Sequence, residues 1–244
     1  MRRFFVDRAA IHGGEAVLDA DESRHLIKVL RLKGGDRVCL FDGDGTVYES
    51  ILAEVGERAR LRILSRREEA ALGRPLIIAQ AMLRGGEMDE LLQRYTELGV
   101  DTFMPIWTGR CQGAFDLIRE TARQARQMNI IKAACKQCGR ARPLRLAKPA
   151  AFGDFLADLS EERPGWRRLM FWEEEETTSL RDVPFAGAAG VVALIGPAGG
   201  WTPEEAAAAQ ARGFQTVRLA GHILRAETAG LAVAALCQFL LANI

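Results

Sequence analysis

The chain has 244 residues, 48% of them hydrophobic, and its 33 basic and 32 acidic residues leave a formal net charge of +1. This length and apolar content support two modest folded domains, whereas five cysteines, an odd number, argue against a disulfide framework. The first residues lack a signal-like segment, and the most apolar stretch, 229–241, is shorter than the roughly 20 residues of a membrane span. We therefore expect a cytoplasmic protein with no membrane contact.

Short β-rich segments separated by turn signals make up the first part of the chain. One helical patch, Ser23–Arg31, interrupts them, and a charged, proline-marked stretch, Arg66–Pro75, is typical of a linker. This pattern predicts a small barrel or sandwich. The predicted strands are 4–6, 15–18, 37–41, 47–55 and 59–64, with a turn at Asp42-Gly43-Asp44-Gly45.

After Pro75 the pattern changes to strands alternating with helices, which is typical of an α/β layer on a largely parallel sheet. Gly99 and Gly139 are placed to end two of the helices. The predicted strands are 76–82, 102–106, 169–172, 191–195 and 216–219. The predicted helices are one over Met88–Leu98, then 115–138, 203–212 and 226–241.

A glycine-rich loop, Gly196–Gly200, joins a predicted strand to a predicted helix. Thr202 is a natural N-cap, Pro203 suits the first helical position, and Glu205 completes a capping box. Such a loop lies at the carboxyl edge of the sheet, where α/β proteins hold ligands. It lacks the residues of a P-loop and of a dinucleotide fingerprint, so phosphate binding is disfavoured. The alternative is a tight turn with no ligand.

Polar residues also follow the last predicted strand, immediately before an almost entirely apolar helix. A helix start would account for Glu227 and Thr228, because an acid complements the helix dipole and threonine caps it. It does not account for Arg225, because a cation at a helix N-terminus is unfavourable without an anionic partner. We therefore predict that Arg225 has an anionic partner or contacts a substrate.

The nearly neutral net charge hides a basic segment, 119–148, that contains a single acid, Glu120. A solvated helix surface usually mixes both signs, so a one-signed run favours contacts with RNA phosphates. The predicted RNA-contacting residues are Arg119, Arg123 and Arg126 on one helix face and Lys132, Lys136 and Arg140 on another, with a second patch at Arg24, Lys28 and Arg31.

Metal-ligand patterns are absent from the sequence. The three histidines are far apart, and Cys135 and Cys138 form a C-x-x-C pair with no second pair or histidine cluster at zinc-finger spacing. We predict a structural role for these cysteines and no metal site.

Five ordered motifs resemble the RsmE family of the SPOUT superfamily. They are Ile195-Gly-Pro-x-Gly-Gly200, Leu219-x-x-x-Ile-Leu-Arg-Ala-Glu-Thr-Ala229, His25-Leu-x-x-Val-Leu-Arg31 with Gly35-Asp36, Thr96-Glu-Leu-Gly-Val100, and Ala134-Cys-Lys-Gln-Cys-Gly-Arg140. The chain departs from the family pattern at Ala198, where a glutamate is usual, at Gly109 before Arg110, at Arg84-Gly85-Gly86-Glu87, and at Ala220-Gly221-His222.

The resemblance implies an α/β fold: a PUA-like β-barrel RNA-binding domain over residues 1–72 and a SPOUT methyltransferase domain with a C-terminal trefoil knot over 73–244. It implies a homodimer that uses S-adenosyl-L-methionine to methylate a uracil N3 in small-subunit (16S) ribosomal RNA. The cofactor-binding residues it implies are Leu194, Gly196, Gly199, Gly200, Leu219, Gly221, Ile223, Leu224, Thr228 and Ala229.

For catalysis, the protein must place the uracil N3 in line with the methyl group and favour its deprotonated form. Arg225 is the candidate for stabilising charge on the uracil oxygens or for holding a phosphate. Glu227 would orient Arg225 or accept the proton, and Arg110 would be a second substrate contact.

Three other functions compete with this interpretation. The first is a SPOUT methyltransferase for another RNA nucleotide, and the second is a non-catalytic RNA-binding relative. The third is a nucleotide-binding Rossmann domain, but its glycine loop should lie near the first strand of the domain rather than near the last.

Overall fold

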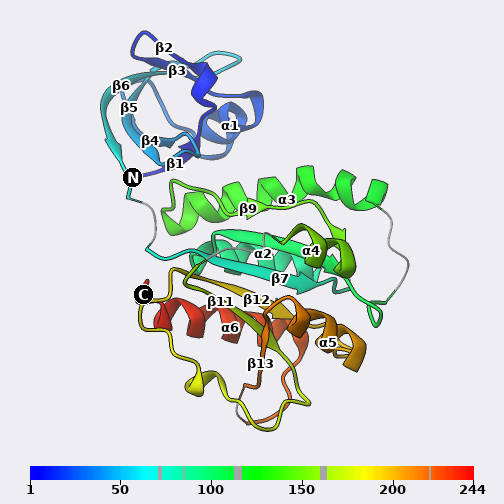
Figure 1. The fold of residues 1–244 in the computed structure, drawn as a ribbon. Coiled ribbons are helices and arrows are strands. Elements are labelled where there is room, and N and C mark those ends of the chain that lie inside the picture. The colour runs from blue at the N-terminus through cyan, green and yellow to red at the C-terminus, as the bar shows by residue number, and fades with distance from the viewer. Residues whose placement is uncertain (71–72, 85, 113–116, 160–163, 220) are drawn as a thin grey trace. The chain divides into compact units, whose positions relative to one another are not determined.

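A computed structural model describes residues 1–70, 73–84, 86–112, 117–159, 164–219 and 221–244, without the side chains of 117–121. The chain divides into two compact units (Figure 1). The N-terminal unit contains residues 1–71 together with 132–143, and the C-terminal unit contains residues 72–131 and 144–244. Within the described chain, no helix is long and apolar enough to cross a membrane.

Six strands form the sheet of the N-terminal unit, in the order β1-β4-β5-β6-β3-β2. Neighbouring strands are antiparallel, except that β1 and β4 run parallel. In Figure 1 the sheet curls around a single core that contains Phe4, Leu26 and Leu40. The strands are β1 (Arg3–Phe5), β2 (Ile11–His12), β3 (Glu15–Val17), β4 (Arg37–Phe41), β5 (Thr46–Glu54) and β6 (Arg60–Glu68), with a 3-10 turn at Arg8–Ala10. The predicted β-rich first part is confirmed.

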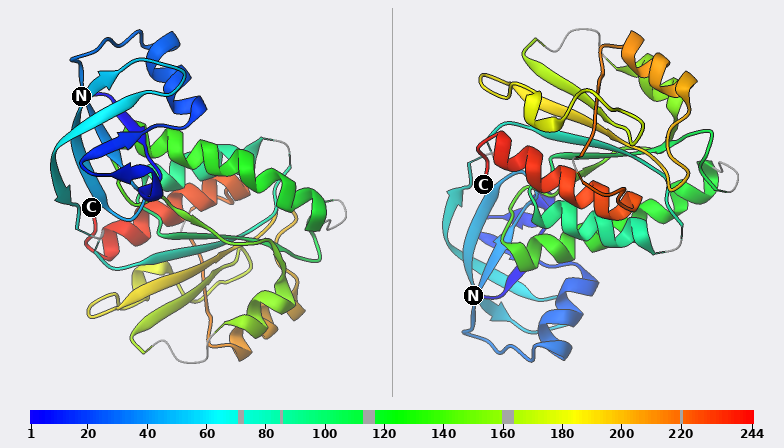
Figure 2. Two further views of the ribbon diagram at one scale, coloured as in Figure 1. Left: turned by 90° about the horizontal axis from the view of Figure 1, so that it is seen from above. Right: turned by 90° about the horizontal axis from the view of Figure 1, so that it is seen from below.

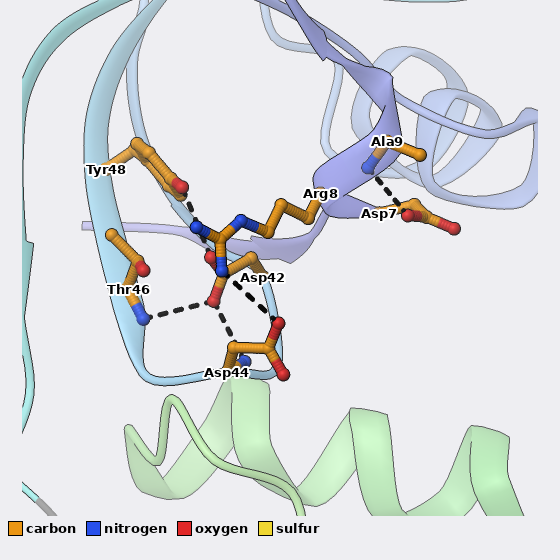
Figure 3. Close-up of polar contacts among 7 residues, drawn as sticks. All are labelled: Asp7, Arg8, Ala9, Asp42, Asp44, Thr46 and Tyr48. Carbon is orange, nitrogen blue, oxygen red and sulfur yellow. Dashed lines mark hydrogen bonds and ion pairs between the residues drawn. The ribbon is translucent and has the colours of Figure 1, made fainter.

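The turn between β4 and β5 is organised by the buried side chain of Asp42 (Figure 3). Its Oδ1 accepts hydrogen bonds from the backbone N–H groups of Asp44 and Thr46, at 2.9 and 3.0 Å, and its Oδ2 accepts one from the Tyr48 hydroxyl at 3.2 Å. Burial raises the pKa of Tyr48, so this hydroxyl remains a donor. The predicted turn is therefore confirmed, and its aspartate explains why it forms there.

Helix α1 (Ala20–Arg24) begins at Asp19, whose side chain accepts from Glu22 N, and continues as a π-helical turn over His25–Val29. Leu26 enters the core from this turn while Lys28 and Val29 face outward. The predicted helical patch is confirmed. The predicted linker 66–75 begins too early, because β6 continues to Glu68 by pairing with Thr46 beyond a register shift in β5.

The C-terminal unit is built on a parallel sheet in the order β10-β8-β7-β12-β11-β13, and β9 also pairs with β8. Its strands are β7 (Leu76–Ala81), β8 (Thr102–Trp107), β9 (Arg145–Leu146), β10 (Ala150–Ala151), β11 (Trp166–Phe171), β12 (Gly190–Ile195) and β13 (Gln215–Val217). The predicted alternation of strands and helices on a parallel sheet is confirmed.

Helices cover both faces of this sheet. Figures 1 and 2 show α2 and α6 side by side on one face, with α4 and α5 on the other. A core lies between the sheet and the second pair, containing Ile77, Phe155, Trp201 and Ala206. Helix α4 was not predicted, because it is too short to show a helical repeat. The helices are α2 (Glu87–Glu97), α3 (Leu117–Cys138), α4 (Phe152–Asp158), α5 (Pro203–Ala211) and α6 (Ala226–Leu240), with a 3-10 turn at Leu180–Asp182.

Candidate active site

A cavity of about 610 Å³ lies at the carboxyl edge of the parallel sheet. Its lining comes from the segments that follow β7, β8, β11, β12 and β13 and from the start of α6. The carboxyl ends of parallel strands meet at one edge, so residues far apart in sequence converge there. The volume is typical of sites that enclose a small molecule.

Most of the predicted cofactor residues line this cavity, namely Gly196, Gly200, Leu219, Gly221, Ile223, Leu224 and Ala229. The others lie close to it in the chain. Leu194 is buried within β12, Gly199 is exposed beside Arg110, and Thr228 is exposed in the first turn of α6. The glycine loop (Gly196–Gly200) and the arginine segment (Gly221–Glu227) are thus two walls of one cavity.

The glycine loop needs its glycines for two physical reasons. Gly200 has φ +72°, which side chains rarely adopt, and an added Cβ there would collide with the Glu173 carboxylate. A Cβ on Gly196 would lie 2.9 Å from Trp201 Nε1, which donates to the carbonyl of Phe171 at 2.9 Å. The loop then enters α5 through the predicted capping box of Thr202 and Glu205, which is confirmed.

In the arginine segment, Arg225 is the residue that precedes α6, and its side chain makes no capping hydrogen bond. Arg225 and Glu227 both line the cavity, which places a cation and a carboxylate together at the start of α6. Ile223 and Leu224 beside them are exposed, Ile223 to 84%. This wall therefore offers an apolar surface next to two charged groups.

An acidic wall of the cavity was not predicted. It is formed by Glu173, Glu175 and Glu176, which follow β11. Hydrogen bonds from the hydroxyls of Thr177 and Thr216 and from backbone N–H groups lower the pKa of Glu175 to about 2. Glu175 therefore organises the loop as a carboxylate that accepts these hydrogen bonds. A run of four glutamates directly after a buried strand, 173–176, was the available signal.

Arg110, predicted to contact RNA, also lines the cavity, but its side chain is already engaged. Its Nη1 donates to the carbonyl oxygens of Gly199 at 3.0 Å and of Trp201 at 3.1 Å. The guanidinium therefore holds the far end of the glycine loop.

The second predicted triplet, Lys132, Lys136 and Arg140, does not form a free charged surface. Lys136 is 20% exposed and pairs with Glu22 at 2.7 Å, and Lys132 Nζ lies 4.0 Å from the centre of the Phe5 ring. Arg140 is buried and donates to the carbonyl of Arg142. These three cations thus pack within the N-terminal unit, which corrects the prediction of a solvent-facing stripe through Arg140.

The first half of the predicted stripe lies in the C-terminal unit. Arg126 is exposed and pairs with Asp89 at 2.9 Å, and Arg123 is half-buried. The side chain of Arg119 lies outside the described residues. A run of positive charges in a helix sequence therefore includes cations with partners elsewhere in the fold as well as cations at the surface.

The second predicted patch, Arg24, Lys28 and Arg31, is exposed on the N-terminal unit. Arg24 lies 3.6 Å from Asp21, a surface pair that leaves both side chains largely in solvent. Arg31 has φ +55°, an uncommon conformation for a residue other than glycine. Val29 between them is 66% exposed, so an apolar side chain lies among three cations.

Comparison with known proteins gives this cavity its context. Residues 70–238 match the family described as RNA methyltransferase domain, and residues 18–63 match the family described as RNA methyltransferase PUA domain. Over 221 residues the chain is 31% identical to ribosomal RNA small subunit methyltransferase E of Synechocystis, an alignment covering 87% of this chain and 69% of that protein. The chain belongs to the RsmE family of RNA methyltransferases.

Other RsmE proteins extend this relationship over nearly the whole chain. The Mycobacterium bovis member is 28% identical over 227 residues, which cover 93% of this chain and 87% of that protein. The crystal structure of the Neisseria gonorrhoeae member bound to S-adenosyl methionine has a TM-score of 0.88 and 30% identity, with 98% of each chain covered. The glycine loop and the arginine segment both lie within the matched RNA methyltransferase domain.

Several departures from the RsmE pattern lie in the cavity wall, including Arg84 and Glu87 as well as Ala198 and His222. Ala198 is exposed and lines the cavity, so the usual carboxylate is missing there, but the Glu173 carboxylate lies against the neighbouring Gly200. His222 is exposed and also lines the cavity. Ala220 lies outside the described residues.

Proposed function

We propose that this protein transfers a methyl group from S-adenosyl-L-methionine to the N3 atom of a uracil in 16S ribosomal RNA of the small subunit. The observation that carries the proposal is the single cavity that joins the glycine loop to Arg225 and Glu227. RsmE relatives bear the name ribosomal RNA small subunit methyltransferase E, and the Neisseria member binds S-adenosyl methionine. We place the reaction in the cytoplasm, where ribosomal RNA is modified.

The chemistry of the cavity suits the cofactor, which is a sulfonium cation carrying an adenosine and an amino acid. Apolar Leu219, Ile223 and Leu224 suit the adenine, and glycine backbone allows the ribose to approach closely. Two carboxylates of the lining, those of Glu173 and Glu175, suit the positive charge. When bound, the cofactor supplies the methyl group.

On the substrate side, the neutral N3–H of uracil is a poor nucleophile, so a cation near the uracil oxygens would favour the deprotonated form. Arg225 is suited to this, because its side chain makes no capping bond and lines the cavity. Glu227 lies two residues further along the chain and would orient Arg225 or accept the proton.

The same proposal assigns the domains. Residues 1–72 would be the PUA-like β-barrel that binds RNA, and residues 73–244 the SPOUT domain, with its C-terminal chain threaded as a trefoil knot. The path of the chain supports the knot. β13 lies at the edge of the sheet beside β11, yet α6, which follows it, packs against β7 and β12 in the middle.

A homodimer is part of the proposal because α6 leaves apolar side chains uncovered. Phe239 is 67% exposed and Leu236, three residues earlier on the same helix face, is also exposed. A helix that is apolar on nearly all sides is normally covered on more than one side. A second copy of this chain would cover Leu236 and Phe239 and bring two active sites together.

For RNA, we propose contacts with the exposed patch of Arg24, Lys28 and Arg31 in the N-terminal unit and with exposed Arg126 in the C-terminal unit. Phosphate contacts need cations that reach solvent, and the pair of Arg126 with Asp89 leaves the Arg126 side chain 76% exposed. Lys136 and Arg140 do not meet this condition, so we assign them to packing of the N-terminal unit.

The direct test is to incubate the purified protein with cofactor carrying a deuterated methyl group and with small subunits from cells that lack the gene. Mass spectrometry of digested 16S RNA should find deuterated 3-methyluridine. A label on a different nucleoside would favour the alternative SPOUT specificity. Absence of both label and cofactor binding in calorimetry would favour a non-catalytic RNA-binding protein.

A further inference from the structure

Gln80 is a fully buried polar residue in β7, whose other side chains are apolar. Buried amides occur where their hydrogen bonds are satisfied, so the partners of Gln80 indicate its role. Its Nε2 donates to the carbonyl of Gly196 at 3.3 Å, and its Oε1 accepts from the Tyr95 hydroxyl at 3.1 Å. Two hydrogen bonds thus connect Tyr95 of α2 through Gln80 of β7 to the carbonyl of Gly196, the first residue of the glycine loop.

Helix α6 packs against Tyr95 and Gln80 so closely that position 230 has no room for a side chain. A Cβ added to Gly230 in α6 would collide with the Tyr95 hydroxyl and lie 2.9 Å from Gln80 Oε1. Burial also raises the pKa of Tyr95, so its hydroxyl stays protonated and donates. Gln80 is thus fixed from two sides, and its amide N–H is directed at Gly196.

The other end of the glycine loop is held from the loop after β8. Arg110 donates to the carbonyls of Gly199 and Trp201, and its Cβ lies so near Gly199 that an added Cβ would be 3.1 Å away. Gly109 N donates to Glu205 Oε1 at 2.7 Å, and the same carboxylate completes the cap of α5. The two anchoring sets share no residue.

We propose that Gln80 and Arg110 are positioning residues that hold the two ends of the glycine loop in the shape that receives S-adenosyl-L-methionine. This inference rests on the proposed function, and it replaces the RNA contact predicted for Arg110. The loop's carbonyl groups are held by these donors, so its conformation is set before the cofactor binds. Losing either donor would allow peptide groups of the loop to rotate and would lower cofactor affinity.

Four variants test the two ends. Arg110→Met removes the donor, and Arg110→Lys restores one. Gln80→Met leaves the buried Tyr95 hydroxyl without its acceptor, so it is compared with Gln80→Met/Tyr95→Phe, in which that hydroxyl is also removed. We expect Arg110→Met and the double variant to raise the dissociation constant of S-adenosyl-L-methionine about tenfold. Arg110→Lys should recover part of the affinity, and RNA affinity should stay within about twofold of wild type. Arg94→Met and Gln93→Met, at exposed positions of α2, are the matched controls.

Hydrogen exchange in the cofactor-free protein gives a second measurement. Gly200 N, which donates to the carbonyl of Pro197, should exchange about tenfold faster in Arg110→Met than in the Arg94→Met control. Unchanged exchange and unchanged cofactor affinity would overturn the proposal, as would loss of RNA affinity alone. If wild-type protein binds no S-adenosyl-L-methionine, the proposed function fails, and the exchange rates still decide whether the loop is held.

Discussion

The two walls of the cavity differ in how they are held. Side chains from two other segments hold the glycine loop, Gln80 of β7 and Arg110 of the loop after β8, and Glu205 of α5 accepts a hydrogen bond from Gly109 N in that second segment. Within the described residues the arginine segment has no comparable support, since Arg225 makes no capping bond and Ile223 is 84% exposed. One wall is preformed, and the other exposes apolar and charged groups that a ligand or a second chain could cover.

This difference separates two requirements of methyl transfer. A preformed wall lowers the entropic cost of binding the cofactor, because the loop need not be ordered at that moment. A less constrained wall can close on the substrate when it arrives, and its charges then act in a site from which water is excluded. The glycine loop should therefore govern cofactor affinity, and the arginine segment should govern turnover.

The largest expected effect comes from filling the preformed wall. Gly200→Val combines a β-branched residue at φ +72° with a collision against the Glu173 carboxylate. We expect S-adenosyl-L-methionine binding to fall at least a hundredfold in calorimetry. Gly153→Val in α4 is the control, because a Cβ there meets nothing within 4 Å. Wild-type affinity in Gly200→Val would show that the cofactor does not use this wall.

Arg225→Ala tests the other wall. Losing one charge that stabilises developing negative charge in an enclosed site costs roughly a hundredfold in rate. The dissociation constant of the cofactor should change far less, and Arg225→Lys should retain part of the activity. Single-turnover methylation of small-subunit RNA, measured beside calorimetry, separates the two quantities. Methylation at the wild-type rate in Arg225→Ala would remove Arg225 from the mechanism.

The glycine loop and its capping box could be predicted because their signals are local: a strand, glycines, then Thr202 and Glu205 at capping spacing. The residues that hold the loop could not. Gln80 meets Gly196 across 116 positions, and nothing in a buried strand indicates where its one polar side chain is directed. The glycine loop can thus be located from local sequence signals, whereas the distant residues that hold it cannot.

Lys136 shows the same limit on the charged surface. Its spacing with Lys132 and Arg140 resembles an RNA-binding face, but its partner Glu22 lies 114 positions away. Long-range pairing leaves no local pattern, so a cation in an internal pair and a cation in solvent look identical in sequence. Only the structure distinguishes an exposed cation from a paired one.

The homodimer would cover the apolar side chains that α6 leaves exposed, and substitutions there should have a smaller effect than those in the cavity. We expect wild-type protein to sediment as a dimer and Leu236→Ser/Phe239→Glu to shift toward monomer at micromolar concentration, because charge would replace exposed apolar surface. Val55→Glu, at another exposed apolar position, is the control and should remain dimeric. A wild-type monomer would contradict the proposed homodimer.

The smallest expected effect is on RNA affinity, where exposed cations can be compared with a paired one. Lys28→Gln/Arg31→Asn removes two exposed charges, and asparagine tolerates the φ of +55° at position 31. We expect weaker RNA binding and a salt dependence shallower by about two phosphate contacts, with the folded protein otherwise intact.

The paired cation Lys136 should behave differently when it is replaced in Lys136→Met. This variant leaves Glu22 largely buried without its cation, so the free energy of unfolding, measured by thermal unfolding, should fall by roughly 2 to 4 kcal/mol. The salt dependence of RNA binding should be unchanged. An unchanged salt slope in Lys28→Gln/Arg31→Asn, or a shallower one in Lys136→Met, would reverse the assignment of these cations to RNA and to packing.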